Sequence, residues 1–249
     1  RRARAARPPV SEASSSDREL LRRSHPTLGN DVALIASEFL AGFQLVQQID
    51  RPAVSIFGSA RVAEATPTYE AARTTARLFA ERGAAGLVIC GRNAQRGQAI
   101  ADELSATCQT LFVRADLTQV DDCRNVIAHA DRAFGRIDIL VNAAGGNDPK
   151  VTVTAERSFE SIQLADWQAN FDLNLVGGVL LPCQEFGPDM AKRGRGSIIN
   201  IASVSAHLPL SRVVSYSSAK AAVLNLSLFL AREWAPKGVR VNTITPGFF

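Results

Sequence analysis

Three polar side chains near the end of the chain have types and spacing suited to proton transfer. Tyr216 and Lys220 are the first and last residues of the segment Tyr-Ser-Ser-Ala-Lys. Ser203 lies thirteen residues before the tyrosine. Side chains four residues apart share one face of a helix. A free phenol, with a pKa of about 10, is a poor base at neutral pH unless a nearby positive charge stabilises its phenolate. Because Lys220 would supply that charge, the pattern predicts an acid–base site.

The elements that must position these residues follow a regular pattern, in which short apolar runs alternate with amphipathic segments. Near-continuous apolar strands are typical of parallel sheets covered on both faces. Right-handed crossovers then predict an α/β fold with a doubly wound, Rossmann-like parallel sheet in the order 3-2-1-4-5-6. Strands are predicted at 53–57, 86–90, 110–114, 137–141, 197–201 and 239–243, and helices at about 69–82, 94–106, 119–134, 166–192 and 213–235.

The start of the chain has a different character. Residues 1–30 are rich in Arg, Ser and Pro and lack hydrophobic periodicity, which predicts a mobile basic tail. Apolar residues then recur at helical spacing over about 31–48, and Pro52 ends that helix. We therefore expect a single Rossmann-like domain over residues 31–249.

Composition and charge argue against several kinds of partner. The net charge is +4 with a pI near 9.1, but the excess is concentrated in the basic tail. No aromatic residues interleave with those arginines, so we expect no nucleic-acid partner. The longest apolar runs are shorter than the roughly 20 residues that span a bilayer, so we expect no membrane segment. The four cysteines lack CxxC spacing, which favours reduced thiols, a cytoplasmic location and no metal site.

From about residue 84 to residue 249 the sequence resembles the short-chain dehydrogenase/reductase family. The resemblance rests on Ser203, on Tyr216-Ser-Ser-Ala-Lys220 and on Asn174 within Asp-Leu-Asn-Leu-Val-Gly. It implies that Tyr216 exchanges a proton with an alcohol or carbonyl and that Ser203 binds the substrate oxygen. Asn174 would hold a water that connects Lys220 to solvent. A chance surface pairing of Tyr and Lys is the alternative, which the matching Ser203 and Asn174 disfavour.

The resemblance also implies a nicotinamide cofactor. Asp116 corresponds to the family's acidic residue at the adenine, although a carboxylate at a helix N-terminus is the alternative. Arg92 occupies the position where an arginine favours the phosphate of NADP, although a solvated loop arginine is the alternative. NADP is therefore the expected cofactor, with NAD possible. The family's contacts fall here on Arg92, Asp116, Asn142, Ala144, Gly145, Tyr216, Lys220, Pro246 and Gly247.

The opening of the chain departs from this family. The glycine-rich run Thr-Gly-x-x-x-Gly-x-Gly, which lets backbone N–H groups approach a pyrophosphate, does not occur. Residues 31–82 instead resemble the opening of the lysine-decarboxylase-like (cytokinin phosphoribohydrolase) Rossmann family, without its working motifs, so the chain looks chimeric. Gly58 and Ser59 would contribute a weaker phosphate site. The family's last strand is also expected to be missing.

The sequence thus predicts an oxidoreductase that interconverts a small-molecule alcohol and a carbonyl, with an impaired cofactor loop. A catalytically silent Rossmann-like nucleotide-binding or interaction protein is the alternative, and a nucleotide hydrolase is a third. The predicted helices at 166–192 and 213–235 resemble those that pair across the family's dimer axis. We therefore expect a homodimer or homotetramer.

Overall fold

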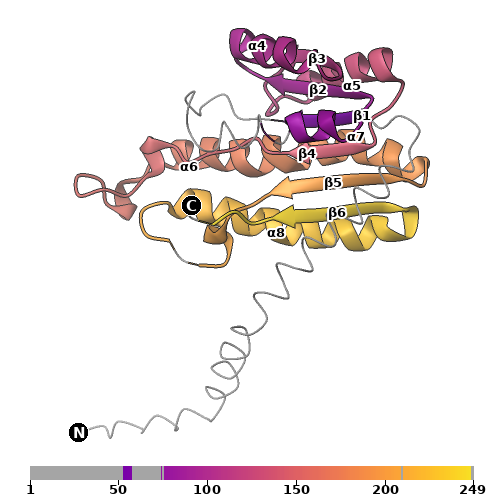
Figure 1. Ribbon diagram of the computed structural model, residues 1–249. Helices are drawn as coiled ribbons and strands as arrows, with labels where there is room; N and C mark the ends of the chain where they lie inside the picture. The colour runs from indigo at the N-terminus through magenta and orange to yellow at the C-terminus, as the bar shows by residue number, and fades with distance from the viewer. Residues whose placement is uncertain (1–52, 58–73, 75, 209, 248–249) are drawn as a thin grey trace, which may run out of the picture. The chain divides into compact units, whose positions relative to one another are not determined.

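The computed structural model describes residues 53–57, 74, 76–208 and 210–247 (Figure 1). The chain divides into two compact units, 1–50 and 51–249, and every described residue belongs to the second. The predicted basic tail, the predicted helix at 31–48 and the candidate phosphate-binding residues Gly58 and Ser59 lie outside the described residues.

The core of the second unit is a parallel sheet whose strand order is β3-β2-β1-β4-β5-β6, as the sequence predicted. Chain order reverses between β1 and β4, where Val54 pairs with Leu87 on one side and with Ile139 on the other. The strands are β1 (Ala53–Phe57), β2 (Gly86–Gly91), β3 (Gln109–Arg114), β4 (Ile139–Asn142), β5 (Gly196–Ile201) and β6 (Val239–Ile244).

Strand β4 begins two residues later than predicted. The N–H of Arg136 Nε is shared between the two carboxylate oxygens of Asp138, each at 3.1 Å, and the carbonyl of Ile137 accepts a hydrogen bond from Arg193 Nη2. The side chains of Arg136 and Arg193 therefore bind residues 138 and 137, with which the strand was predicted to begin.

Helices cover the sheet between successive strands. The longer ones are α4 (Ala94–Leu104), α5 (Val120–Phe134), α6 (Leu164–Phe171), α7 (Leu181–Lys192) and α8 (Val214–Trp234). Within the predicted helix at 69–82, residue 74 and residues 76–81 are described as helical. Helix α4 packs on β2 and β3, whereas α5 contacts α7, and α6 contacts α8. Right-handed crossovers that run in opposite directions along a sheet lie on opposite faces, so α4 and the group α5 to α8 cover different faces.

The main hydrophobic core lies between the sheet and the helices α5, α7 and α8. Leu140 and Ile198 of the central strands are fully buried there, together with Val126 of α5 and Val223 of α8. Each such side chain contributes about 1.5–3 kcal/mol by leaving water. This core holds the carboxyl ends of the strands in fixed positions.

The helix predicted over 166–192 is interrupted by η3 (Asp172–Leu180), which has π-helical hydrogen bonding. Close backbone packing accompanies the wider turns: a Cβ on Gly177 would lie 2.8 Å from the carbonyl oxygen of Leu117 and 2.7 Å from the amide nitrogen of Thr118. Only glycine allows the loop after β3 to lie this close. Short π-helical segments are often found at functional sites.

One segment, Val214–Lys237, is long and apolar enough to cross a membrane by length and composition alone, although the sequence predicted no such span. In the fold, its helix α8 packs against β6 and β5. It also buries polar side chains, among them Ser215, Lys220 and Ser227. Part of the apolar content of α8, including Val223 and Leu230, therefore belongs to the core of this domain.

Candidate active site

Ser203, Tyr216 and Lys220 are brought together where β5 ends and α8 begins. Ser203 lies two residues after β5, and its Oγ accepts a hydrogen bond from the amide of Ser205 at 3.2 Å, which caps the 3-10 helix η4 (Val204–Ala206). Tyr216 lies in the first turn of α8, and Lys220 follows one turn later. Strand and helix thus direct the three side chains to one region, as the spacing predicted.

Lys220 is held in a dry environment. The residue is only 4% exposed, and its Nζ donates a hydrogen bond of 2.7 Å to the carbonyl oxygen of Ile201. Nζ lies 5.6 Å from the centroid of the Tyr216 ring. Burial lowers the pKa of Lys220 from 10.5 to about 8. The lysine therefore stays mostly protonated at neutral pH and places a positive charge beside the phenol.

The surroundings of Tyr216 act on its pKa in opposite directions. Burial raises the pKa of the phenol above its ordinary value, and a hydrogen bond with the Ser203 side chain lowers it. Burial is the larger effect. At neutral pH the phenol is protonated and can donate a proton to an oxygen placed between Ser203 and Tyr216. Removal of a proton from an alcohol requires stabilisation of the phenolate, for which Lys220 is the nearby cation.

Asn174 holds a glycine loop against the same site. Its Oδ1 accepts from the amide of Gly146 at 2.9 Å, and its Nδ2 donates to the carbonyl of Gly146 at 2.9 Å. Gly145, with φ of 150°, lies so close that a Cβ there would be 2.6 Å from Asn174 Oδ1 and 3.2 Å from Lys220 Nζ. Asn174 and Lys220 therefore meet at this loop, and Lys220 in turn lies beside the Tyr216 ring. The predicted water between Asn174 and Lys220 remains a prediction.

Two further polar residues at this site were missed by the sequence reasoning. Asn170 and Ser215 are both fully buried. Asn170 Nδ2 donates to the Gly146 carbonyl at 3.1 Å, and Asn170 Oδ1 accepts from Ser215 Oγ at 3.1 Å. The available signals were the spacing of four residues between Asn170 and Asn174 and the position of Ser215 beside Tyr216.

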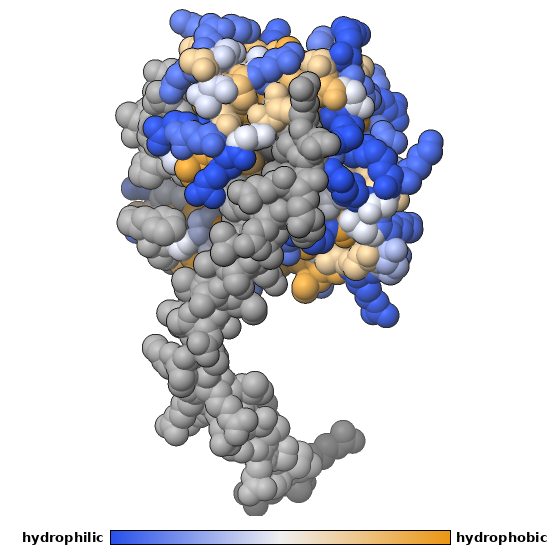
Figure 2. All heavy atoms as spheres, turned by 45° about the vertical axis from the view of Figure 1, so that its right-hand side comes forward, coloured by the Kyte–Doolittle hydropathy of each residue, from blue (hydrophilic) through white to orange (hydrophobic). Residues whose placement is uncertain are grey.

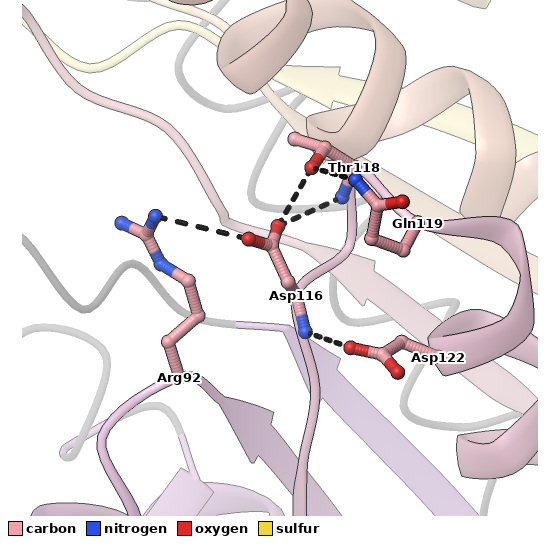
Figure 3. Close-up of polar contacts among 5 residues, drawn as sticks. All are labelled: Arg92, Asp116, Thr118, Gln119 and Asp122. Carbon is pink, nitrogen blue, oxygen red and sulfur yellow. Dashed lines mark hydrogen bonds and ion pairs between the residues drawn. The ribbon is translucent and has the colours of Figure 1, made fainter.

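Arg92 and Asp116 face each other at the carboxyl ends of β2 and β3 (Figure 3). Arg92 Nη1 lies 4.0 Å from Asp116 Oδ2, and both side chains are partly exposed, so the pair is weak. Asp116 Oδ1 also accepts from the amide and the hydroxyl of Thr118, at 3.1 and 2.8 Å. Asp116 thus shapes the turn before α5, while Arg92 remains near the surface.

The predicted Asn142, Ala144 and Gly145 segment follows β4. The Asn142 side chain donates to Asn200 Oδ1 at 2.8 Å and to Cys183 Sγ at 3.4 Å. It therefore links β4 to β5 in the centre of the sheet. Ala144 is buried, and Gly145 closely approaches Asn174 and Lys220.

The predicted Pro246-Gly247 turn follows β6 and lies beside the segment that carries Ser203. The Pro246 carbonyl accepts from the amide of Val204 at 2.9 Å, next to Ser203. Two residues earlier, the Ile244 carbonyl accepts from the amide of Ala202 at 2.8 Å. The turn is thus held to the segment that carries Ser203.

The described residues offer groups to a nicotinamide dinucleotide at two places. Arg92 and Asp116 present polar groups at the carboxyl ends of β2 and β3, and the Pro246 turn lies beside the segment that carries Ser203. Nucleotides bind to doubly wound sheets at the carboxyl ends of the strands, near the reversal of strand order. The predicted pyrophosphate loop lies outside the described residues.

Comparisons with known proteins agree with this arrangement. A family model described as short chain dehydrogenase matches residues 72–249. An uncharacterized oxidoreductase of Bacillus subtilis is 34% identical over 174 residues, which are 66% of this chain and 62% of the relative. A D-threitol dehydrogenase of Mycolicibacterium smegmatis is 37% identical over 69% of this chain and 63% of the relative. The chain thus spans about three fifths of the length of these relatives.

Solved structures give the same result. A Haemophilus influenzae structure with bound NAD, named as a candidate D-mannonate oxidoreductase, has a TM-score of 0.71 and 29% identity, covering 81% of this chain and 72% of that one. The expected resemblance of residues 31–82 to the lysine-decarboxylase-like family finds no support in these comparisons. The family model instead begins at residue 72, inside that segment.

Proposed function

The chain belongs to the short-chain dehydrogenase family, and from this premise we propose that it acts as a nicotinamide-dependent oxidoreductase that interconverts an alcohol and a carbonyl compound. The observation that carries the proposal is the convergence of Ser203, the Tyr216 phenol and the buried Lys220 ammonium. These groups offer a hydrogen-bond donor, a proton donor and a fixed charge around one position.

In the reduction direction, Tyr216 gives its phenolic proton to the carbonyl oxygen as that oxygen gains negative charge. Ser203 donates a hydrogen bond to the same oxygen, and Lys220 stabilises the phenolate that remains. In the oxidation direction, the phenolate removes the hydroxyl proton of the alcohol. The nicotinamide, when bound, supplies or accepts the hydride at the substrate carbon.

We propose that the cofactor is NADP, with NAD as a weaker ligand. Arg92 supports this preference, because a guanidinium can pair with the 2′-phosphate that only NADP carries. Its ion pair with Asp116 is long, at 4.0 Å, and leaves the guanidinium available. Arg92→Gln should weaken NADPH binding about tenfold or more and leave NADH binding nearly unchanged, as followed by nicotinamide fluorescence. Equal loss for both cofactors would contradict the assignment.

The chimeric opening and the impaired cofactor loop remain part of the proposal. The sequence before residue 72 lacks the family's glycine run, so fewer backbone N–H groups would reach the pyrophosphate. A catalytically silent nucleotide-binding or interaction protein is the second candidate on the same ground. Ligand-induced thermal stabilisation by NADPH, followed by turnover, separates the two: binding without turnover favours the silent protein.

For the substrate we propose a small polyhydroxylated alcohol or sugar acid. Two similar proteins bear the names of such compounds, D-threitol and D-mannonate. The test is a panel of polyols, sugar acids and simple secondary alcohols, followed by formation of reduced cofactor. Turnover confined to simple hydrophobic alcohols would contradict this class.

We further propose that the protein is located in the cytoplasm and forms a homodimer or homotetramer.

A further inference from the structure

Asn170 of α6 lies at the centre of a small buried network that connects three parts of the site. Its side-chain amide donates to the carbonyl of Gly146 at 3.1 Å, and its amide oxygen accepts from the hydroxyl of Ser215 at 3.1 Å. Asn170 and Ser215 have no exposed surface. One side chain therefore joins the loop after β4 to the first turn of α8.

The Gly146 loop has another anchor that does not depend on the side chain of Asn170, although Asn174 Nδ2 also donates to the Asn170 backbone carbonyl at 2.8 Å. Asn174 binds both the amide and the carbonyl of Gly146, each at 2.9 Å. The hydrogen bond from Asn170 to the same carbonyl adds a second donor to an acceptor that is already paired. What Asn170 alone provides, among the contacts of the described residues, is the connection to Ser215 of α8.

That connection lies directly beside the reacting group. Ser215 precedes Tyr216, and its hydroxyl would be an unpaired buried donor without Asn170. Such an orphaned group favours displacement of the backbone toward water or toward another partner. A shift of the first turn of α8 would move the phenol relative to Lys220, whose Nζ is bound separately to the carbonyl of Ile201.

We propose that Asn170 is a positioning residue which acts through Ser215 to hold Tyr216 in register with Lys220 and the Gly146 loop. The effect on turnover rests on the proposed oxidoreductase function, whereas the hold of Asn170 and Ser215 on the surroundings of Tyr216 is tested separately below. It adds two residues, on α6 and α8, to the group predicted from the sequence.

A double-mutant cycle tests the coupling. Asn170→Ala and Ser215→Ala should each lower kcat about ten- to a hundredfold, with the KM for the cofactor changed less than about threefold. The double variant should be no worse than the more damaging single variant, because both remove the same connection. Ser218→Ala is the matched control: that hydroxyl also lies on α8 but is exposed and binds the carbonyl of Val214 at 2.9 Å.

Fully additive losses in the cycle, or losses confined to KM, would overturn the proposal. Ser215→Thr, which keeps a hydroxyl, should restore most of the activity that Ser215→Ala loses. If Asn170→Ala does not fold, the activities of Ser215→Ala, Ser215→Thr and Ser218→Ala still test the proposal. Equal activity in all three variants would contradict the coupling.

A second readout is independent of turnover. The chain contains two tyrosines, Tyr69 and Tyr216, so tyrosinate absorbance in a Tyr69→Phe background reports on Tyr216 alone. Ser215→Ala should move the midpoint toward the ordinary tyrosine value of about 10, because burial is the main cause of its displacement. An unmoved midpoint would contradict positioning. If the wild-type chain shows no turnover, the proposed function fails, whereas this titration still tests the inference.

Discussion

Lys220 combines its proposed catalytic role with a buried charge that lowers the stability of the folded chain. The residue is 4% exposed, and burial lowers its pKa from 10.5 to about 8. Below pH 8 the folded and unfolded chains both carry the proton, so the full cost of the buried charge is present. Between about pH 8 and 10.5 the unfolded chain binds more protons than the folded one, and stability from this residue therefore rises with pH. The total difference is about 3 kcal/mol.

Lys220→Met should therefore abolish turnover and yet leave the chain at least as stable as the wild type at pH 7. Loss of the hydrogen bond to the Ile201 carbonyl offsets part of the gain by about 1–3 kcal/mol. The difference in unfolding free energy between variant and wild type should shift in favour of the wild type as pH rises from 8 toward 10. Urea denaturation at several pH values measures it. A difference that stays constant over this range would contradict the assigned cause.

Tyr216 and Lys220 could be predicted from the sequence because their spacing on one helix is local information, and Ser203 because it follows a recognisable strand. Asn170 and Ser215 could not be predicted in this way. They are 45 residues apart and meet only when α6 packs on α8. No periodicity in the sequence marks such a contact between two buried polar side chains.

At the scale of elements, the strand order could be predicted because apolar runs alternate with amphipathic segments and crossovers are right-handed. The π-helical interruption at η3 could not. Within this segment, Gly177 packs closely against the backbone of Leu117 and Thr118. Such a contact depends on tertiary packing and leaves no periodic signal in the sequence. The same packing places the turn that carries Asp116 against the helix of Asn174.

Gly177→Ala tests this packing, because the sign of the change in stability distinguishes a crowded glycine from an ordinary helical one. In an ordinary helix, alanine in place of glycine adds about 1 kcal/mol of stability. Here the added Cβ would lie within 2.8 Å of backbone atoms of the neighbouring loop, so we expect a loss of about 1–3 kcal/mol. NADPH binding should also weaken, because the Asp116 turn must shift. Val176→Ala serves as the control, and a stabilised Gly177→Ala would contradict the account.

At the scale of the whole molecule, we propose that copies of the chain assemble through the outer surface of α8. Figure 2 shows, for one face of the molecule, that hydrophobic residues are exposed among hydrophilic ones. Leu228 and Phe229 of α8 are 70% and 57% exposed, which is unusual for neighbouring large apolar side chains. These residues lie on the helix that the sequence predicted to pair across a dimer axis.

Replacement of both Leu228 and Phe229 by Glu should convert a dimer or tetramer to a monomer, because like charges would face each other in a buried contact. Light scattering coupled to size-exclusion chromatography measures the mass. Leu78→Glu, at a residue 40% exposed in a different helix, should leave the assembly unchanged. A wild-type chain that is already monomeric at tens of micromolar would contradict the predicted oligomer.

The central claim is that Tyr216 is the acid–base group of a nicotinamide-dependent oxidoreductase. The most direct measurement compares wild type and Tyr216→Phe in cofactor-dependent turnover and in NADPH binding on the same preparations. The account predicts that kcat falls about 10²–10⁴-fold, while the Kd for NADPH changes less than about twofold, since the phenol acts mainly in the transition state. Turnover of the phenylalanine variant equal to that of the wild type would contradict the claim.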